Sequence, residues 1–138
     1  MYAWAEQNSG KVGAIYANAP VCDIRSLVAL RNEQPDPARW KMVVDVFGFH
    51  NLNDALAYRG SPFDNLAPLA KAGVPLLHVV GDADTVVPEE ENTRVLEQRY
   101  KASGGSIQVS VKRGVAHMHG LDDPMSIIKF LLAHRPTA

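Results

Sequence analysis

The fold is decided by the stretch VPLLHVVGDADTVVP, residues 74–88. Its first seven residues are apolar almost throughout, which is typical of a parallel strand that is covered on both faces. Gly81 then begins a turn that contains Asp84 and ends at Pro88. A carboxylate just beyond the carboxyl end of a parallel strand lies where open α/β sheets bind their ligands. The stretch therefore predicts a central strand and, directly after it, a candidate functional turn.

Shorter apolar runs before and after this stretch predict two more strands. One spans Val12–Ala17 and the other spans residues 107–111, and each is linked to the central strand through helical sequence. Helical crossovers between strands produce parallel sheets. The expected fold class is therefore α/β, with about three parallel strands flanked by helices. The expected helices cover residues 1–8, 36–47, 53–58, 65–72, 89–103 and 124–134.

Length and composition indicate a single domain over residues 1–138, in which residues 36–72 form a helical, insertion-like region. The chain is 46% hydrophobic and 21% charged, as in an ordinary soluble globular protein. The net charge of −1 gives no electrostatic reason to expect nucleic acid or an anionic membrane as a partner. The chain has a single cysteine, Cys22, and its N-terminus has no signal-peptide pattern. Both observations favour the cytoplasm, unless the chain is the second half of a longer protein whose lost N-terminal half carries a signal.

A second polar turn follows the third expected strand. It has the sequence GVAH, residues 114–117, so His117 should lie at the same edge of the sheet as Asp84. An aspartate there can hold an imidazole in the tautomer that a general base needs and can stabilise its cation. His119 stands two residues further on and could take the same role. The structural alternative is that Asp82 and Asp84 only shape their turn and cap the next helix.

These two motifs resemble the C-terminal half of the α/β-hydrolases, the superfamily of esterases, lipases and dienelactone hydrolases. The similarity covers residues 74–135, and residues 1–20 resemble the helix after the nucleophile elbow and the sixth strand of that fold. The resemblance implies that Asp84 is the acid and His117 the histidine of a catalytic triad, with His119 as the alternative histidine. It also implies that the chain is related to serine enzymes that hydrolyse esters.

The nucleophile motif of that superfamily, G-x-S-x-G, does not occur in residues 1–138. Ser106 has a glycine two residues before it, but Gln108 stands where the second glycine belongs. Cys22 fails the same test and is expected to be a small buried hydrophobe. The remaining serines lack the preceding glycine: Ser9, Ser26, Ser61, Ser103, Ser110 and Ser126. The glycine-rich loop that supplies oxyanion-hole donors is also absent, so no serine-esterase turnover is expected from these residues alone.

The pattern of the other polar residues predicts no metal and no cofactor. The histidines and the single cysteine show no metal-ligand spacing, and Gly104-Gly105 matches no phosphate-binding loop. His78, in the middle of the apolar strand, is expected to be a core histidine with satisfied hydrogen bonds. Four aromatic residues of the helical region are expected in the core, with the lining of a pocket as the alternative: Trp40, Phe47, Phe49 and Tyr58.

In the α/β-hydrolase fold the sixth strand pairs with a fifth strand, and residues 1–138 contain no counterpart of that fifth strand. The expected strand Val12–Ala17, which resembles the sixth, should therefore lie at an edge of the sheet. An apolar edge strand presents unpaired N–H and C=O groups and is a template for pairing. We expect two copies to form a homodimer across this edge, with a sheet of about six strands, or across the apolar surface around Tyr2, Trp4 and Tyr16. A separately encoded N-terminal half is the other expected partner.

Three functions fit these observations. The first is a hydrolase-derived chain that retains Asp84 and His117 and is inactive alone. The second is a carboxylic-ester hydrolase whose serine comes from the separate N-terminal half. The third is a non-catalytic binding or assembly module that uses the old substrate crevice or the exposed edge.

Overall fold

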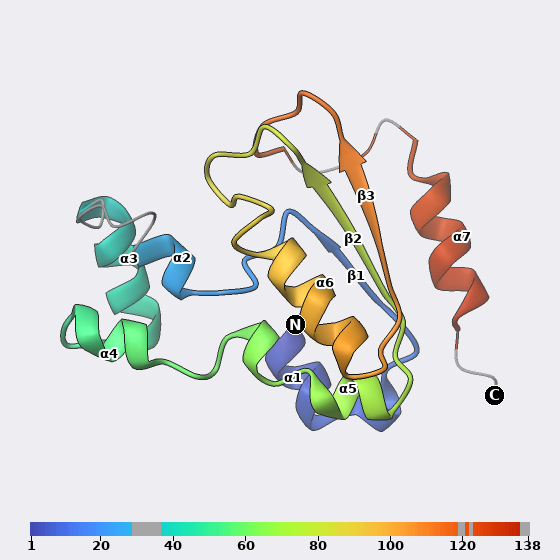
Figure 1. The fold of residues 1–138 in the computed structure, drawn as a ribbon, viewed down its shortest axis with the longest axis horizontal. Coiled ribbons are helices and arrows are strands. Elements are labelled where there is room, and N and C mark those ends of the chain that lie inside the picture. Colours follow the sequence, from blue (N-terminus) through green and yellow to red (C-terminus); the bar gives the residue numbers. More distant parts are fainter. Residues whose placement is uncertain (29–36, 119–120, 122, 136–138) are drawn as a thin grey trace.

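The computed structural model describes residues 1–28, 37–118, 121 and 123–135. Within these residues the chain forms a three-stranded sheet with helices on both sides (Figure 1). The strands are β1 (Ile15–Asn18), β2 (Leu76–Gly81) and β3 (Ile107–Lys112), and they pair in parallel in the order β1-β2-β3. The α/β class and the three parallel strands expected from the sequence are confirmed.

The central strand β2 is buried along its whole length. Its neighbours occupy both edges, with Ala17 and Val109 both in register with His78. The three strands therefore end at one edge of the sheet, which we call the carboxyl edge. The turns that contain Asp84 and His117 begin at this edge, one after β2 and the other after β3.

The first strand is shorter at its start than the expected span Val12–Ala17. The N–H of Val12 closes a tight turn by donating to Ser9 O at 3.3 Å, so the chain is not yet extended there. Pairing with β2 begins where the N–H of Ile15 donates to Pro75 O at 3.0 Å. The strand ends before Ala19, whose φ of 44° turns the backbone out of the extended region.

Helices surround the sheet on both faces, and most lie close to the spans expected from the sequence. Helix α6 starts at Thr93, four residues later than expected, because residues 89–92 form turns. The helical segments are α1 (Tyr2–Gln7), η1 (Ser9–Lys11), α2 (Arg25–Val28), α3 (Pro37–Phe47), α4 (Leu52–Ala57), η3 (Pro62–Asp64), α5 (Ala67–Lys71), α6 (Thr93–Ala102) and α7 (Met125–Ala133). Among the described residues, no helix is long and apolar enough to cross a membrane.

The main hydrophobic core lies between the sheet and the layer formed by α1, α5 and α6. Tyr100 of α6 is fully buried there, and its hydroxyl donates to Val74 O at 2.6 Å. Helix α7 lies on the opposite side of the sheet, where it contacts β1 and buries Phe130 (Figure 1). Four large apolar residues of α7 remain exposed: Met125, Ile128, Leu131 and Leu132.

Helices α2, α3 and α4 form a separate helical lobe beside the sheet (Figure 1). The lobe has its own small core of Ile24, Val28, Val43 and Ala55. The helical region expected over residues 36–72 is thus divided, because η3 and α5 pack against the main core instead. Residue 36 itself lies outside the described residues.

Several buried positions agree with the sequence analysis, and one does not. His78 is fully buried, and its ring nitrogens bond to Tyr2 Oη at 2.6 Å and to Thr93 Oγ1 at 2.9 Å. Cys22 is also fully buried. Tyr2, which was expected on an uncovered apolar surface, is buried instead, because its hydroxyl reaches His78 inside the main core. Trp4 does remain 58% exposed.

Candidate active site

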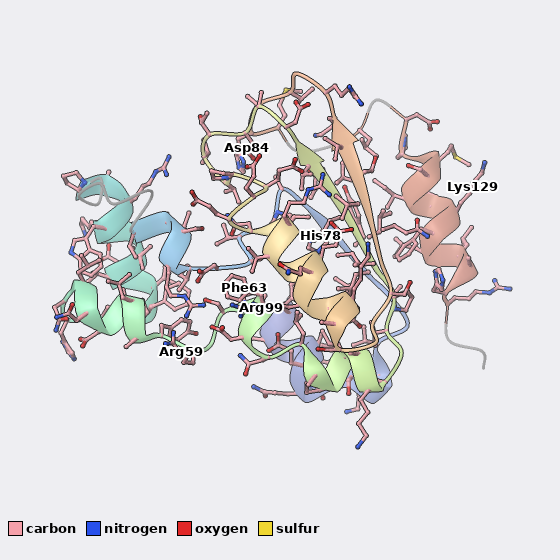
Figure 2. The ribbon with its side chains drawn as sticks, viewed as in Figure 1. Arg59, Phe63, His78, Asp84, Arg99 and Lys129 are labelled. Atoms are coloured by element: carbon pink, nitrogen blue, oxygen red, sulfur yellow. The ribbon has the colours of Figure 1, made fainter. Side chains whose placement is uncertain are left out.

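Asp84 lies in the turn directly beyond the carboxyl end of β2 (Figure 2). Its Oδ1 accepts hydrogen bonds from the N–H groups of Val86 and Val87, both at 2.8 Å. An aspartate that bonds to the backbone two residues on forms its own turn, which fixes the carboxylate at this position. The side chain is only 2% exposed.

The surroundings of Asp84 favour its charged form. Burial by itself would raise the pKa of this carboxyl. Hydrogen bonds from the N–H of Val87, from His117 and from the N–H of Val86 act in the opposite direction and hold the pKa below its ordinary value. Asp84 is therefore an anion at neutral pH.

The turn after β3 is held against the turn after β2. Asp82 Oδ1 accepts from the N–H of Gly114 at 2.6 Å, and the N–H of Ala83 donates to Val115 O at 3.1 Å. Gly81 permits this close approach, since a Cβ at that position would lie 2.1 Å from Val115 O. Gly114 has a φ of +68°, a conformation that glycine adopts without strain.

This arrangement brings His117 and Asp84 together, although they are 33 residues apart in the sequence. Nδ1 of His117 lies 2.8 Å from Oδ2 of Asp84. Because a carboxylate only accepts, the contact places a proton on Nδ1, and in a neutral ring Nε2 is then the basic nitrogen. The His117 side chain is 26% exposed, so solvent reaches the pair. The alternative histidine, His119, lies outside the described residues.

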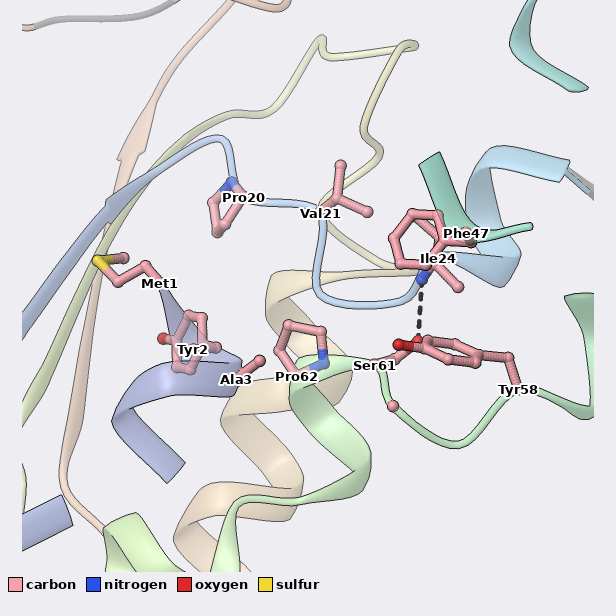
Figure 3. A pocket seen from close by; sticks show the side chains of 11 residues that line it. Met1, Tyr2, Ala3, Pro20, Val21, Ile24, Phe47, Tyr58, Ser61 and Pro62 are labelled. Atoms are coloured by element: carbon pink, nitrogen blue, oxygen red, sulfur yellow. Dashed lines mark hydrogen bonds between the residues drawn. The ribbon is translucent and has the colours of Figure 1, made fainter. Parts of the chain in front are cut away.

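An apolar pocket of about 400 Å³ lies between the start of α1, the loop after β1 and the helical lobe (Figure 3). Three of the four aromatic residues, Trp40, Phe49 and Tyr58, are partly buried and pack against the core of the lobe. Phe47 and Tyr58 line the pocket, so Tyr58 takes part in both. The remaining lining residues are Met1, Tyr2, Ala3, Pro20, Val21, Ile24, Gly60, Ser61 and Pro62.

Three of the serines occupy positions that do not suit a nucleophile. Ser26 Oγ donates to Asp23 O at 2.7 Å, and Ser103 Oγ donates to Arg99 O at 3.0 Å. Ser106 directly precedes β3 and so lies at the edge of the sheet opposite to Asp84. Within the described part of the chain, no group of three His, Cys, Asp or Glu side chains could hold a metal ion.

Two residues near the pair were not recognised from the sequence. Asp82 was interpreted only as a turn former, yet it joins the two turns through Gly114. Asn92 is buried and bonds to both loops that follow β1 and β2. In the sequence Asn92 falls inside the expected helix 89–103, so no signal pointed to it, whereas in the structure it stands directly before α6 and its side chain makes no capping bond.

No family model and no curated protein matches this chain. Several solved structures do match. Acylaminoacyl peptidase from Pyrococcus horikoshii is 15% identical, with a TM-score of 0.70 over 96% of this chain and 22% of that one. Dipeptidyl peptidase 4 from Porphyromonas gingivalis is 21% identical, with a TM-score of 0.62 over 91% of this chain and 16% of that one. Est1E from Butyrivibrio proteoclasticus is 19% identical, with a TM-score of 0.58 over 96% of this chain and 55% of that one.

These structures all belong to the α/β-hydrolase superfamily. The chain therefore has a partial α/β-hydrolase fold of three parallel strands flanked by helices. It spans about a fifth of the length of the first of them and about half of the length of Est1E. At these identities the likeness defines the fold, so function has to be argued from the site.

Proposed function

We propose that this chain is the acid-and-base part of an α/β-hydrolase that cleaves acyl groups from esters, and that it corresponds to the C-terminal half of that fold. The observation that carries the proposal is the 2.8 Å contact between His117 Nδ1 and Asp84 Oδ2 at the carboxyl edge of a parallel sheet. Fixed backbone donors on Oδ1 of Asp84 leave Oδ2 directed at the imidazole. Together they form the orienting acid and the base of a hydrolase triad.

In this mechanism His117 Nε2 removes the proton from a hydroxyl nucleophile as that oxygen attacks the acyl carbon. The imidazolium that forms is stabilised by Asp84, and it then gives the proton to the leaving oxygen. The nucleophile and the oxyanion-hole donors come from a segment outside residues 1–138. The positions of Ser26, Ser103 and Ser106 support this part of the proposal. The fully buried thiol of Cys22 suits a reducing compartment such as the cytoplasm.

The chain alone should show no hydrolysis that depends on His117. Purified wild type and His117→Ala are each incubated with p-nitrophenyl acetate, and the release of p-nitrophenol is followed. We expect equal rates near the background, because no acyl-enzyme forms without a nucleophile. Coexpression with the polypeptide encoded immediately upstream should then produce turnover that His117→Ala abolishes. Saturable turnover by the chain alone that is lost in His117→Ala would contradict the external nucleophile.

The outer edge of β1 is the surface at which we propose that assembly occurs. Ile15 and Ala19 donate their N–H groups towards β2, so by the alternation of a strand the N–H groups of Tyr16 and Asn18 face outwards. Exposed apolar residues lie beside the start of this strand, with Trp4 58% and Leu131 41% exposed around Ile15. We propose that the chain alone forms a homodimer across this edge and that the nucleophile-bearing half, when present, pairs at the same edge.

The dimer is tested by removing one outward hydrogen-bond donor. Tyr16→Pro deletes an N–H that makes no bond to β2, so it should convert the dimer into a monomer without losing an internal ladder bond. Tyr16→Ala is the matched control, since it removes the same side chain and keeps the N–H. Light scattering after size-exclusion chromatography should give a dimer for wild type and Tyr16→Ala. A wild-type monomer at micromolar concentration would overturn the dimer.

A non-catalytic binding role is the second candidate, and the apolar pocket of about 400 Å³ is the observation that favours it. A pocket of this size and character is typical of small-molecule sites. A ligand found in a small-molecule screen of this chain separates the two functions. Binding that persists unchanged when both Asp84 and His117 are replaced by alanine would favour the binding role.

A further inference from the structure

Asn92 is a buried polar residue that the proposed mechanism does not use. It is 1% exposed and stands directly before α6, although its side chain does not cap that helix. The side chain instead lies between the loop that follows β1 and the turn that follows β2. Both of these connections leave the sheet at its carboxyl edge, where the candidate active site lies.

The amide oxygen of Asn92 holds the loop after β1. It accepts from the N–H of Cys22 at 2.9 Å and from the N–H of Asp23 at 3.1 Å. Backbone N–H groups can only donate, so this orientation of the amide is the one that the contacts allow. The same loop supplies Val21 and Ile24 to the wall of the apolar pocket.

The amide nitrogen of Asn92 holds the turn after β2. It donates to Pro88 O at 3.1 Å, and also to Ser26 Oγ at 3.2 Å. Pro88 directly follows Val87, whose N–H donates to Asp84 Oδ1. The proline ring already fixes φ, so a bond to the proline carbonyl restrains the remaining rotation in this part of the turn. The position of Asp84 thus depends on where Asn92 holds Pro88.

We propose that Asn92 is a positioning residue that joins the Asp84 turn to the wall of the apolar pocket, so that the acid–base pair and the pocket keep one fixed relation. This role rests on the proposed function of Asp84 and His117. One amide group serves both loops, and losing it leaves the N–H of Cys22 and the N–H of Asp23 without their acceptor. Movement of the pocket wall and of the acid turn should therefore occur together.

The test replaces Asn92 by alanine and measures both loops by NMR. Hydrogen exchange of the Val87 amide should become about tenfold faster, as for the loss of about one hydrogen bond, and so should exchange at Cys22 and Asp23. The ¹³C titration of the Asp84 carboxyl should move towards a higher pKa, because the bond from the Val87 N–H lowers that pKa in the wild type. A role confined to the stability of the fold would leave this titration unchanged.

Ser26→Ala is the matched control. It removes a hydroxyl from the same network but leaves the bond from Asn92 to Pro88 O, so Val87 exchange and the Asp84 titration should stay as in the wild type. An Asn92→Ala variant with unchanged Val87 exchange and an unchanged Asp84 titration would overturn the proposal. If Asn92→Ala does not fold, Asn92→Asp keeps the acceptor and loses the donor. Asn92→Asp should accelerate hydrogen exchange at Val87 and not at Cys22. A Val87 exchange rate equal to that of the wild type would overturn the proposal.

Failure of the proposed function has a different signature. His117→Ala should raise the pKa of Asp84, because the hydrogen bond from His117 lowers it. If His117→Ala leaves that titration unchanged, the acid–base pair is wrong and the positioning role falls with it. An effect of Asn92→Ala on Val87 exchange would in that case show only that the two loops are linked.

Discussion

Replacing Asp84 by asparagine in the assembled hydrolase is expected to lower kcat about 10⁴-fold and to leave KM nearly unchanged. The asparagine amide can donate to Nδ1 of His117, which forces the proton onto Nε2 and removes the base. The amide also carries no charge to stabilise the imidazolium. Binding of the substrate before the reaction does not use this contact. The measurement is steady-state hydrolysis of an activated ester by the chain together with its nucleophile-bearing half.

Asp82→Asn is the matched control because Asp82 lies in the same turn. Its Oδ1 accepts from the N–H of Gly114, and an asparagine amide oxygen can accept the same bond. We expect a change in kcat of less than about tenfold, since the carboxylate that orients the imidazole is that of Asp84. Equal losses in the two variants would mean that the turn, and not the charge of Asp84, supports activity.

The approach of Asp84 and His117 could be predicted from the sequence because it follows from topology. The stretch 74–80 is apolar almost throughout, as in a parallel strand that is covered on both faces, and parallel strands end at the same edge. Residues that follow two adjacent strands then become neighbours whatever their separation along the chain. The distance of 2.8 Å depends on Gly81 and Asp82, whose role in joining the turns is a tertiary effect.

The errors arose where a local pattern competed with tertiary contacts. Val12 has the composition of a strand, but its N–H closes a turn onto Ser9, and that turn delays the start of β1. Tyr2 has no polar neighbour in the sequence that would explain its burial, and its partner His78 is 76 residues away. Asn92 is a similar case, because its partners Cys22 and Asp23 lie 70 and 69 residues earlier in the sequence, in the loop that follows β1. Long-range polar contacts of this kind leave no periodic signal in the sequence.

Acidification should destabilise the protein through His78. Burial lowers the pKa of His78 from 6.5 to about 4 in the folded chain. The unfolded chain therefore binds a proton between pH 6.5 and 4 that the folded chain does not bind, so stability is lost as pH falls through this window. Because the ring is fully buried, the full effect of about 3 kcal/mol is expected.

Glu6 acts in the opposite direction over nearly the same range. Burial raises the pKa of its carboxyl from 4.5 to about 7, and its Oε1 is buried without a hydrogen-bond partner. The folded chain then binds the proton more tightly, so this contribution is present below pH 4.5 and is lost as pH rises through 7. Since Glu6 is only partly buried, water screens it, and its effect should be smaller than that of His78.

Single substitutions separate these two contributions. Glutamine at position 78 can still donate and accept towards Tyr2 and Thr93 but does not titrate, so His78→Gln should remove the part of the loss on acidification that comes from this ring. Glu6→Gln should make that loss steeper than in the wild type. The free energy of unfolding is measured by urea titration at several pH values between 4 and 7. His50→Gln applies the same change to an exposed histidine. This variant is the control. If His50→Gln reduces the pH dependence of the free energy of unfolding as much as His78→Gln does, the buried ring is not the source of the acid sensitivity.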